Sequence, residues 1–267
     1  MDAIRVADSA TRLDAAARGA VVVCGSHGGL YAAWLAARAG VRGIVLNDAG
    51  LGRNSAGIAG VAWLGGLGIA ACAIDYRSGR IADGADMLAH GVVSMANDAA
   101  AALGCAPGQA CRHAANLLLA STGPGTAQIP EIGETRLRIA NTGHRDVWAI
   151  DSIALARESD TRAIVVTGSH AALLGGKPDA MLVVDVFAAF FNDAGGGKDD
   201  AGYARLPVLD ARGVAAATVS HNTARIGDGR STYNTGVISR INEAARRLEL
   251  REGMSARDAV SRLVGLG

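Results

Sequence analysis

Residues 21–50 read VVVCGSHGGLYAAWLAARAGVRGIVLNDAG, and this stretch decides the fold class. Residues 21–25 and 43–47 are short apolar runs, and residues 30–40 between them have the composition and the closing glycine of a helix. The apolar runs do not alternate with polar residues, which is typical of strands buried on both faces of a parallel sheet. The order strand, helix, strand therefore predicts an α/β fold.

The same pattern returns in the second half of the chain. CGSHGG at residues 24–29 matches TGSHAA at residues 167–172, an offset of 143 positions. LNDAG, which begins at residue 46, matches FNDAG, which begins at residue 191, and later blocks keep this second offset of 145 positions. Matches over this length predict an internal duplication, and so long a period indicates duplicated domains and not a solenoid.

We therefore expect internally duplicated βαβαβα units, with mostly parallel sheets in a pseudo-twofold arrangement. The rest of the first unit is predicted as a helix over residues 56–68, a strand over 69–75 and a last helix over 91–104. The expected domains are a first α/β repeat over residues 1–108, a connecting segment without a counterpart over 109–146, and a second repeat over 147–267.

Three weaker patterns lie outside these elements. Residues 5–7 and 148–150 each have the composition of a short additional strand. Residues 135–140 and 146–150, separated by NTGHR, are predicted to form a hairpin.

The composition excludes several classes of function. Half of the 267 residues are apolar, the formal net charge is +1 and no dense basic run is present, so neither nucleic acid nor a membrane is an expected partner. Residues 54–74 carry no charge over 21 positions, and we interpret them as a buried helix followed by a strand. The four cysteines lack Cys-x-x-Cys spacing and the N-terminus lacks a secretory pattern, which together predict a reducing cytoplasm.

Polar side chains recur where the predicted strands end. Gly-Ser-His follows the first strand of each repeat, and Asn-Asp-Ala-Gly follows the second. The carboxyl ends of parallel strands meet at one edge of a doubly wound sheet, where such sheets bind ligands. The candidate catalytic residues are Ser26, His27, Asp48, Ser169, His170 and Asp193. The candidate substrate-binding residues are Asn47, Arg80, Asp83, Asn192, Arg225 and Asp228.

Each motif has a functional and a structural interpretation. His27 and His170 are candidate acid/base groups, which Asp48 and Asp193 would orient, and a serine of one repeat could pair with the histidine of the other. Alternatively, the serines cap helices, the histidines bond to backbone and Asn-Asp-Ala-Gly forms a turn. The two Arg-Ile-x-Asp-Gly segments either hold a carboxylate or phosphate of a substrate or close a turn with an internal ion pair.

The sequence predicts a small-molecule enzyme with a site at the interface of the two repeats. We expect a hydrolase or another acid/base catalyst that acts on a polar or carboxylate-bearing metabolite. A non-catalytic binding protein for an anionic metabolite and a purely structural duplication are the alternatives. The repeats differ at Gly28 and Gly29, which become Ala171 and Ala172, so one shared or one degenerate site is expected. No cofactor is predicted, and a divalent metal and a homo-oligomer are left open.

Overall fold

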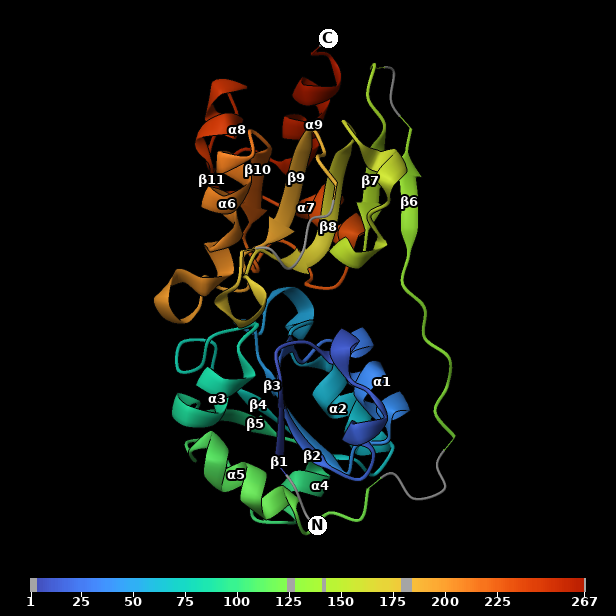
Figure 1. Ribbon diagram of the computed structural model, residues 1–267, viewed down its shortest axis with the longest axis vertical. Helices are drawn as coiled ribbons and strands as arrows, with labels where there is room; N and C mark the ends of the chain where they lie inside the picture. Colours follow the sequence, from blue (N-terminus) through green and yellow to red (C-terminus); the bar gives the residue numbers. More distant parts are fainter. Residues whose placement is uncertain (1–3, 124–127, 141–142, 179–183, 267) are drawn as a thin grey trace.

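The computed structural model describes residues 4–123, 128–140, 143–178 and 184–266. They form two similar α/β units, each a mostly parallel sheet interleaved with helices, stacked end to end along the long axis of the molecule (Figure 1). The first and last described residues lie at opposite ends of the molecule (Figure 1). The loops that follow the parallel strands of both units meet at the junction between them.

The first sheet has five strands in the order β1-β2-β3-β4-β5. Their bounds are Ile4–Ala7 (β1), Val21–His27 (β2), Gly43–Asn47 (β3), Ala70–Ile74 (β4) and Val93–Ala96 (β5). The strands β1 to β4 run parallel, and β5 pairs with β4 in the antiparallel direction. Alternate residues of the buried strands contribute to two different apolar clusters, so the sheet is covered on both faces.

Helices supply the other half of each cluster. The bounds are Leu30–Ala39 (α1), Ala59–Gly66 (α2), Gly84–His90 (α3), Asp98–Ala101 (α4) and Cys111–Leu118 (α5). α1 and α2 pack on one face through Ala33 and Leu64, whereas α3 and α5 pack on the other through Met87 and Leu118. The uncharged residues 54–74 thus contain α2 and β4. None of the helices within the described ranges is long and apolar enough to cross a bilayer.

The second sheet has six strands in the order β11-β10-β9-β8-β7-β6. Their bounds are Arg136–Ile139 (β6), Val147–Ile150 (β7), Ile164–His170 (β8), Ala188–Asn192 (β9), Ala215–Val219 (β10) and Ile238–Ile241 (β11). The strands β7 to β10 run parallel, and the edge strands β6 and β11 are antiparallel to their neighbours.

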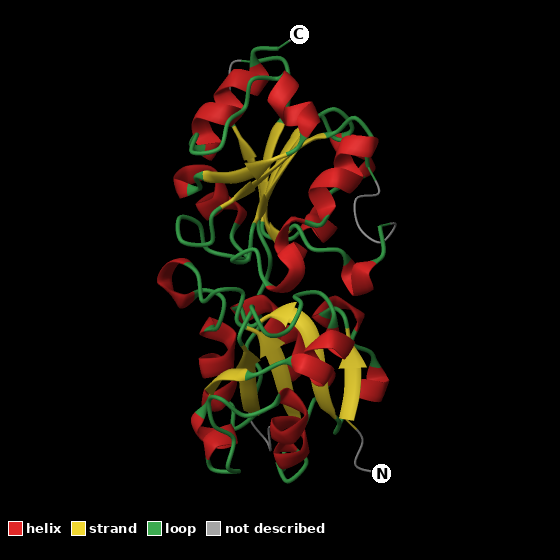
Figure 2. Ribbon diagram, turned by 90° about the vertical axis from the view of Figure 1, so that its left-hand side faces the viewer, coloured by secondary structure: helices red, strands yellow, loops and turns green. Residues whose placement is uncertain are grey.

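Helices flank the second sheet as they flank the first (Figure 2). The bounds are Arg205–Ala211 (α6), Gly229–Thr235 (α7), Glu243–Arg247 (α8) and Ala256–Val264 (α9). α6 packs on one face through Leu206 and Leu209, whereas α8 and α9 pack on the other through Ala245 and Leu263.

The predicted α/β class is confirmed, and β2, α1, β3, α2 and β4 follow in the predicted order. The short strands β1 and β7 and the antiparallel pairing of β6 with β7 are also as predicted. The turn of that hairpin includes residues 141–142, which lie outside the described residues. The predicted helix over residues 91–104 is wrong: β5 and α4 occupy it, because Asn97 interrupts the run and caps α4 by accepting from the Ala100 N–H.

The two units differ after their first long strand. Helix α1 follows β2, whereas in the described part of the segment after β8 the regular element is a 3₁₀ turn, Leu174–Gly176. The segment predicted as a connection is divided between the units. Helix α5 packs into the first core, β6 extends the second sheet, and residues 128–134 run beside α1 before reaching β6.

Candidate active site between the two units

The two Asn-Asp-Ala-Gly loops touch each other across the junction. Ala49 and Ala194 have the same φ of 49° and are buried in one apolar cluster with Ile81, Leu174 and Ile226, which come from both units. A Cβ on the glycine that follows either alanine would come within 2.8 Å of a ring of the opposite unit. The left-handed backbone and the close approach both require glycine there. These loops therefore hold the units together.

Asn47 and Asn192, predicted to bind substrate, are used inside these loops. Both side chains are fully buried. Their Nδ2 groups donate to backbone carbonyls of Gly79 and Ala224, and their Oδ1 atoms accept from the alanine two positions on. With the amide oxygen and an amide N–H engaged in the fold, the two residues support the turns and do not line the cavity described below.

The prediction that Asp48 and Asp193 orient His27 and His170 does not agree with the hydrogen bonds. Oδ1 of Asp48 accepts from backbone N–H groups of Gly50 and Tyr76. Oδ1 of Asp193 accepts from the equivalent backbone groups and also lies 3.0 Å from Nδ1 of His221, which is a different histidine. The positive φ of the alanine that follows turns each loop, so that the carboxylate lies against its own unit.

A cavity of about 420 Å³ lies between the units. His27 and His170 both line it, as do residues from the ends of β2 and β8, the first turns of α1, and the loop before α7. Ile132, Gly133 and Glu134 of the connecting segment complete the wall. The structure thus brings six of the predicted site residues to one place: Ser26, His27, Ser169, His170, Arg225 and Asp228.

The two histidines face each other in the same hydrogen-bonded state. Their ring centroids are 6.4 Å apart and the rings are nearly perpendicular. Nδ1 of His27 accepts from the Gly29 N–H at 3.1 Å, and Nδ1 of His170 accepts from the Ala172 N–H at 3.2 Å. Because an accepting Nδ1 carries no proton, each neutral ring has its proton on Nε2. Each histidine is thus a donor through Nε2.

Burial keeps both rings neutral. It lowers the pKa of His27 to about 4. It also lowers the pKa of His170 to about 3, with smaller contributions from the charges of His27 and Arg205. A neutral imidazole is a poor general base at these values, but it is a suitable hydrogen-bond donor to an oxygen that becomes negatively charged.

The serines are bound to backbone. Oγ of Ser26 accepts from the Ala10 N–H, and Oγ of Ser169 accepts from the Ile153 N–H, both at 2.9 Å. Each serine thereby fixes the end of its strand to the turn that follows the preceding strand. Since Nδ1 of each histidine is occupied by its own loop, a serine activated by either histidine would have to use Nε2.

Glu134 was missed by the sequence analysis. This half-buried carboxyl lines the cavity from the connecting segment. Burial raises its pKa to about 7, and nearby Asp151 acts in the same direction, whereas hydrogen bonds with Tyr31 and Ser152 act in the opposite one. A carboxyl that titrates near neutral pH is suited to take up and return a proton. The other site residues are marked in the sequence by matches between the repeats, whereas the segment that carries Glu134 has no counterpart.

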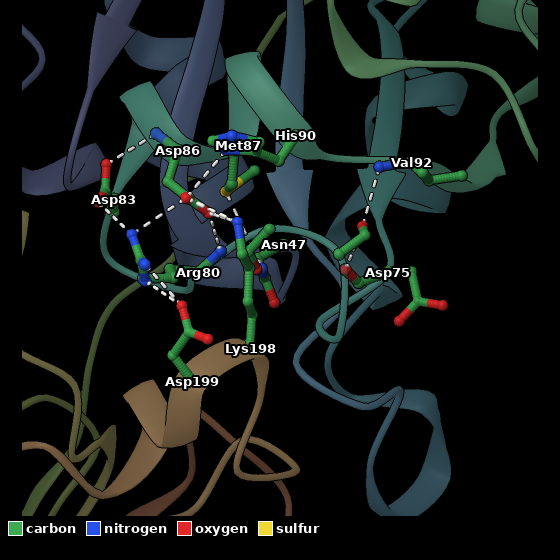
Figure 3. A network of polar contacts seen from close by, with 12 residues as sticks. Asn47, Asp75, Arg80, Asp83, Asp86, Met87, His90, Val92, Lys198 and Asp199 are labelled. Atoms are coloured by element: carbon green, nitrogen blue, oxygen red, sulfur yellow. Dashed lines mark hydrogen bonds and ion pairs between the residues drawn. The ribbon is translucent and has the colours of Figure 1, made fainter.

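Arg80 and its network lie at the junction but outside the cavity, which corrects its predicted role in substrate binding. Figure 3 shows its guanidinium between Asp83, Asp86 and Asp199, with Lys198 reaching Asp86 from the second unit. Asp83 caps α3 by accepting from the Asp86 N–H. Asp86 is only 5% exposed, and this network connects the two units electrostatically.

Arg225 has a different environment from Arg80, to which it corresponds in the sequence. Ser231 and Asn54 stand 145 positions from Asp86 and Asp199, so two of the three carboxylates of the Arg80 network have no counterpart in the sequence around Arg225. Its Nη2 pairs with Asp228 at 2.6 Å, and half of the side chain is exposed at the cavity. Arg225 therefore remains accessible to an anionic ligand.

A buried arginine supports the His170 loop. Nη2 of Arg205 donates to the carbonyl of Ala172, while Nε and Nη1 make no hydrogen bond within the described part of the chain. Burial lowers its pKa to about 10. In the first unit the matching carbonyl of Gly29 accepts from the Ala33 N–H in the first turn of α1. Arg205 thus replaces the donor that a helix supplies in the first unit.

Comparison of the chain with protein-family models, with curated proteins and with solved structures gave no match. The groups around the cavity are therefore the evidence for a function. Within the described ranges, no three or more histidine, cysteine, aspartate or glutamate side chains gather closely enough to hold a metal ion.

Proposed function

We propose that this protein is an acid/base catalyst that moves a proton on a small carboxylate-bearing metabolite in the cavity between its two units. The observation that carries the proposal is the combination of Glu134, whose pKa is about 7, with two neutral imidazole donors in one cavity. Two groups with such different protonation behaviour at one site are typical of proton-transfer enzymes.

Each group has a defined part in the proposed reaction. Arg225 binds the carboxylate of a 2-oxo acid through its guanidinium. The Glu134 carboxylate removes a proton from the carbon beside the oxo group, and the electron pair of that C–H bond moves to form the enolate. Nε2–H groups of His27 and His170 donate to the oxygen that becomes negative. Glu134 then returns the proton to carbon.

The hydrogen bonds favour proton transfer over hydrolysis by a serine. Ser26 and Ser169 already accept from backbone, and the low pKa of each histidine makes it a weak base for activating a hydroxyl group. Within the acid/base class that the sequence predicts, Glu134 is therefore the better candidate for the base.

The differences between the units support a single site. We propose that the units arose by duplication and that one side of the junction became a structural contact. On that side Asp86 and Asp199 pair with Arg80 and neutralise its charge. The turn at Leu174–Gly176 also packs against the first unit there, since the Gly175 N–H donates to the Ala82 carbonyl. The four cysteines are free and buried, which supports a reducing compartment such as the cytoplasm. Homo-oligomerisation remains a prediction.

Hydrogen exchange tests the proposed chemistry. In deuterated buffer, ¹H NMR should show the hydrogens beside the oxo group of 2-oxo-4-phenylbutanoate exchanging faster with the wild-type protein than with Glu134→Gln. Exposed Glu131 lies on the same segment and pairs with Arg38, so Glu131→Gln is the matched control and should keep the wild-type rate. Equal rates for wild type and Glu134→Gln would reject the proposal.

A non-catalytic binding protein is the second candidate, and the accessibility of Arg225 favours it equally. Such a protein would bind 2-oxo acids in a manner that Arg225→Gln abolishes, without accelerating exchange. Glu134→Gln would then leave both binding and exchange unchanged.

A further inference from the structure

The cavity has an apolar arm that the proposed proton transfer does not use. Leu30 and Leu35 of α1 line it, together with Ala59 of α2 and Ile132 of the connecting segment. Tyr31 also lines the cavity, but its hydroxyl group hydrogen-bonds with Glu134. Leu30 is 41% exposed although it lies on the cavity wall. An exposed large apolar side chain inside a concave wall is typical of a surface that an apolar ligand group covers.

The arm leads away from Arg225 and His170 at the junction. β2 and β3 are parallel neighbours, so α1 must run back from the junction along the sheet. A helix rises about 1.5 Å per residue, which places Leu35 roughly 7–8 Å further from the junction than Leu30. Arg225 and His170 belong to the second unit and lie at the junction. The cavity therefore has a polar end at the junction and an apolar end beside α1.

The connecting segment forms the outer wall of this arm. Nε1 of Trp34 donates to the Pro130 carbonyl at 2.9 Å, and Arg38 pairs with Glu131. Figure 1 shows this segment passing along the flank of the first unit, outside α1, on its way to β6. Its next residues, including Ile132 and Glu134, reach the cavity. The segment places an apolar side chain and the proposed base on the same wall.

The second unit offers no equivalent arm in its described part. Leu174 stands where the first unit has Tyr31, in a 3₁₀ turn and not in a helix. Arg205 stands where the first unit has Gly60, at which a Cβ would come within 2.5 Å of the Ala33 Cβ in α1. In the first unit this position allows α1 and α2 to pack closely. In the second unit the buried side chain of Arg205 fills the corresponding space. The arm beside α1 belongs to the first unit.

We propose that the substrate is an amphiphilic 2-oxo acid, with its carboxylate at Arg225 and an aryl or branched alkyl tail in the arm beside α1. This inference rests on the proposed function, which supplies the position of the head group. A cavity of about 420 Å³ is far larger than pyruvate requires and lies within the range of about 300–1,000 Å³ common for organic ligands.

A matched set of three ligands tests whether an apolar tail contributes to binding. Pyruvate has only the head, 2-oxo-4-phenylbutanoate has head and tail, and 4-phenylbutan-2-one has only the tail and the carbonyl. Binding is measured by NMR line broadening of each probe, and exchange is measured in deuterated buffer. We expect the aryl acid to bind at least about tenfold more tightly than pyruvate. Arg225→Gln should remove this binding, and the ketone should bind weakly.

Two variants that fill the arm separate tail binding from chemistry. Leu35→Trp and Ala59→Phe should each reduce the affinity for the aryl acid about tenfold while leaving the binding of pyruvate unchanged. Ala59 is exposed, so Ala59→Phe tests the arm even if Leu35→Trp fails to fold. Leu137→Trp on the exposed edge strand β6 is the control and should change neither affinity.

The outcomes distinguish the two proposals. Equal Arg225-dependent affinity for pyruvate and the aryl acid would overturn the amphiphilic substrate and leave the proposed proton transfer intact. Arg225-dependent, tail-dependent binding without exchange would support the amphiphilic ligand and overturn the proton transfer. Equal binding of the ketone and the aryl acid, unaffected by Arg225→Gln, would overturn both.

Discussion

His27 and His170 place their rings 6.4 Å apart and nearly perpendicular, one from each unit, and each Nδ1 accepts a backbone N–H two residues ahead. This shared geometry leaves both Nε2–H groups as donors at one cavity. Each unit supplies one of the two histidines, so the pair of donors forms only where the two units of the chain meet.

Two substitutions of His27 separate its acceptor from its donor. Oδ1 of asparagine can take the place of Nδ1, whereas Nε2 of glutamine can take the place of the ring Nε2–H. We expect His27→Asn to retain the loop and to slow exchange about 10²–10³-fold, as the loss of an oxyanion donor does. His27→Gln should retain more activity than His27→Asn, measured by exchange at equal folded concentration. The opposite order would contradict a donor role.

The low histidine pKa values make stability depend on pH. Between pH 6.5 and about 4, the unfolded chain binds protons at His27 and His170 that the folded protein does not bind. The free energy of unfolding should therefore fall as the pH drops through this range, by several kcal/mol for the two groups together, at about 1.4 kcal/mol per pKa unit. Urea titrations at pH 7 and 4.5 would measure the change.

The matched control for this pH dependence replaces both histidines with asparagine. Glu134 acts in the opposite direction, because its raised pKa lets the folded protein bind a proton that the unfolded chain releases. Both proteins should therefore carry Glu134→Gln. An equal loss of stability with and without the histidines would show that other groups cause the change.

Glu134 should set the pH dependence of exchange. A general base must be ionised, so the rate should rise with pH through about 7 and then level off. Glu134→Gln should reduce the rate about 10²–10⁴-fold. A flat profile from pH 5 to 9 in the wild-type protein would mean that another group transfers the proton.

Arg205 is expected to act on His170 without reaching the substrate. Its charge lowers the pKa of His170, so Arg205→Met should raise that pKa while leaving His27 unchanged. Ring ¹⁵N shifts followed over pH would show this change, which a purely structural loss would not produce selectively. Arg240→Gln removes another arginine that pairs with Asp200 and serves as the control. An unchanged His170 titration in Arg205→Met would reject the electrostatic role.

Asp86 should contribute to stability and not to activity. Asp86→Asn removes a nearly buried carboxylate that Lys198 and Arg80 share. The loss should be smaller than the about 3–5 kcal/mol for a fully buried pair, because the Arg80 side chain is 42% exposed. Asp185→Asn, which removes one partner of the exposed Arg212–Asp185 ion pair, is the control and should have little effect. A lower exchange rate per folded molecule in Asp86→Asn would contradict this separation.

The sequence predicted those parts of the fold that depend on local pattern. Continuous apolar runs predicted β2 and β3 correctly, and the repeated Gly-Ser-His predicted the two histidines that meet at the cavity. The prediction of one helix over residues 91–104 was wrong because their apolar content suits a strand and a helix equally. Asn97 ends the strand and caps the helix that follows it.

The sequence could not predict the directions of the side chains. Asp48 follows a strand next to the one that carries His27, but the positive φ of Ala49 turns the loop so that the Asp48 carboxylate accepts from the Gly50 and Tyr76 N–H groups of its own unit. Glu134 could not be predicted from the sequence for another reason. It lies in the segment without a counterpart, and its raised pKa depends on burial and on the nearby charge of Asp151, which only the folded chain brings about.

The segment that carries Glu134 is at once the covalent link between the units and a wall of the cavity. It is fixed to the first unit through Trp34 and to the second through Thr135, whose N–H donates to Asp151. Surface linkers commonly tolerate added residues at small entropic cost. If Glu134 is the base that we propose, the length of the link is part of the catalytic geometry, so an insertion between Pro130 and Glu134 should preserve folding yet abolish the proposed exchange.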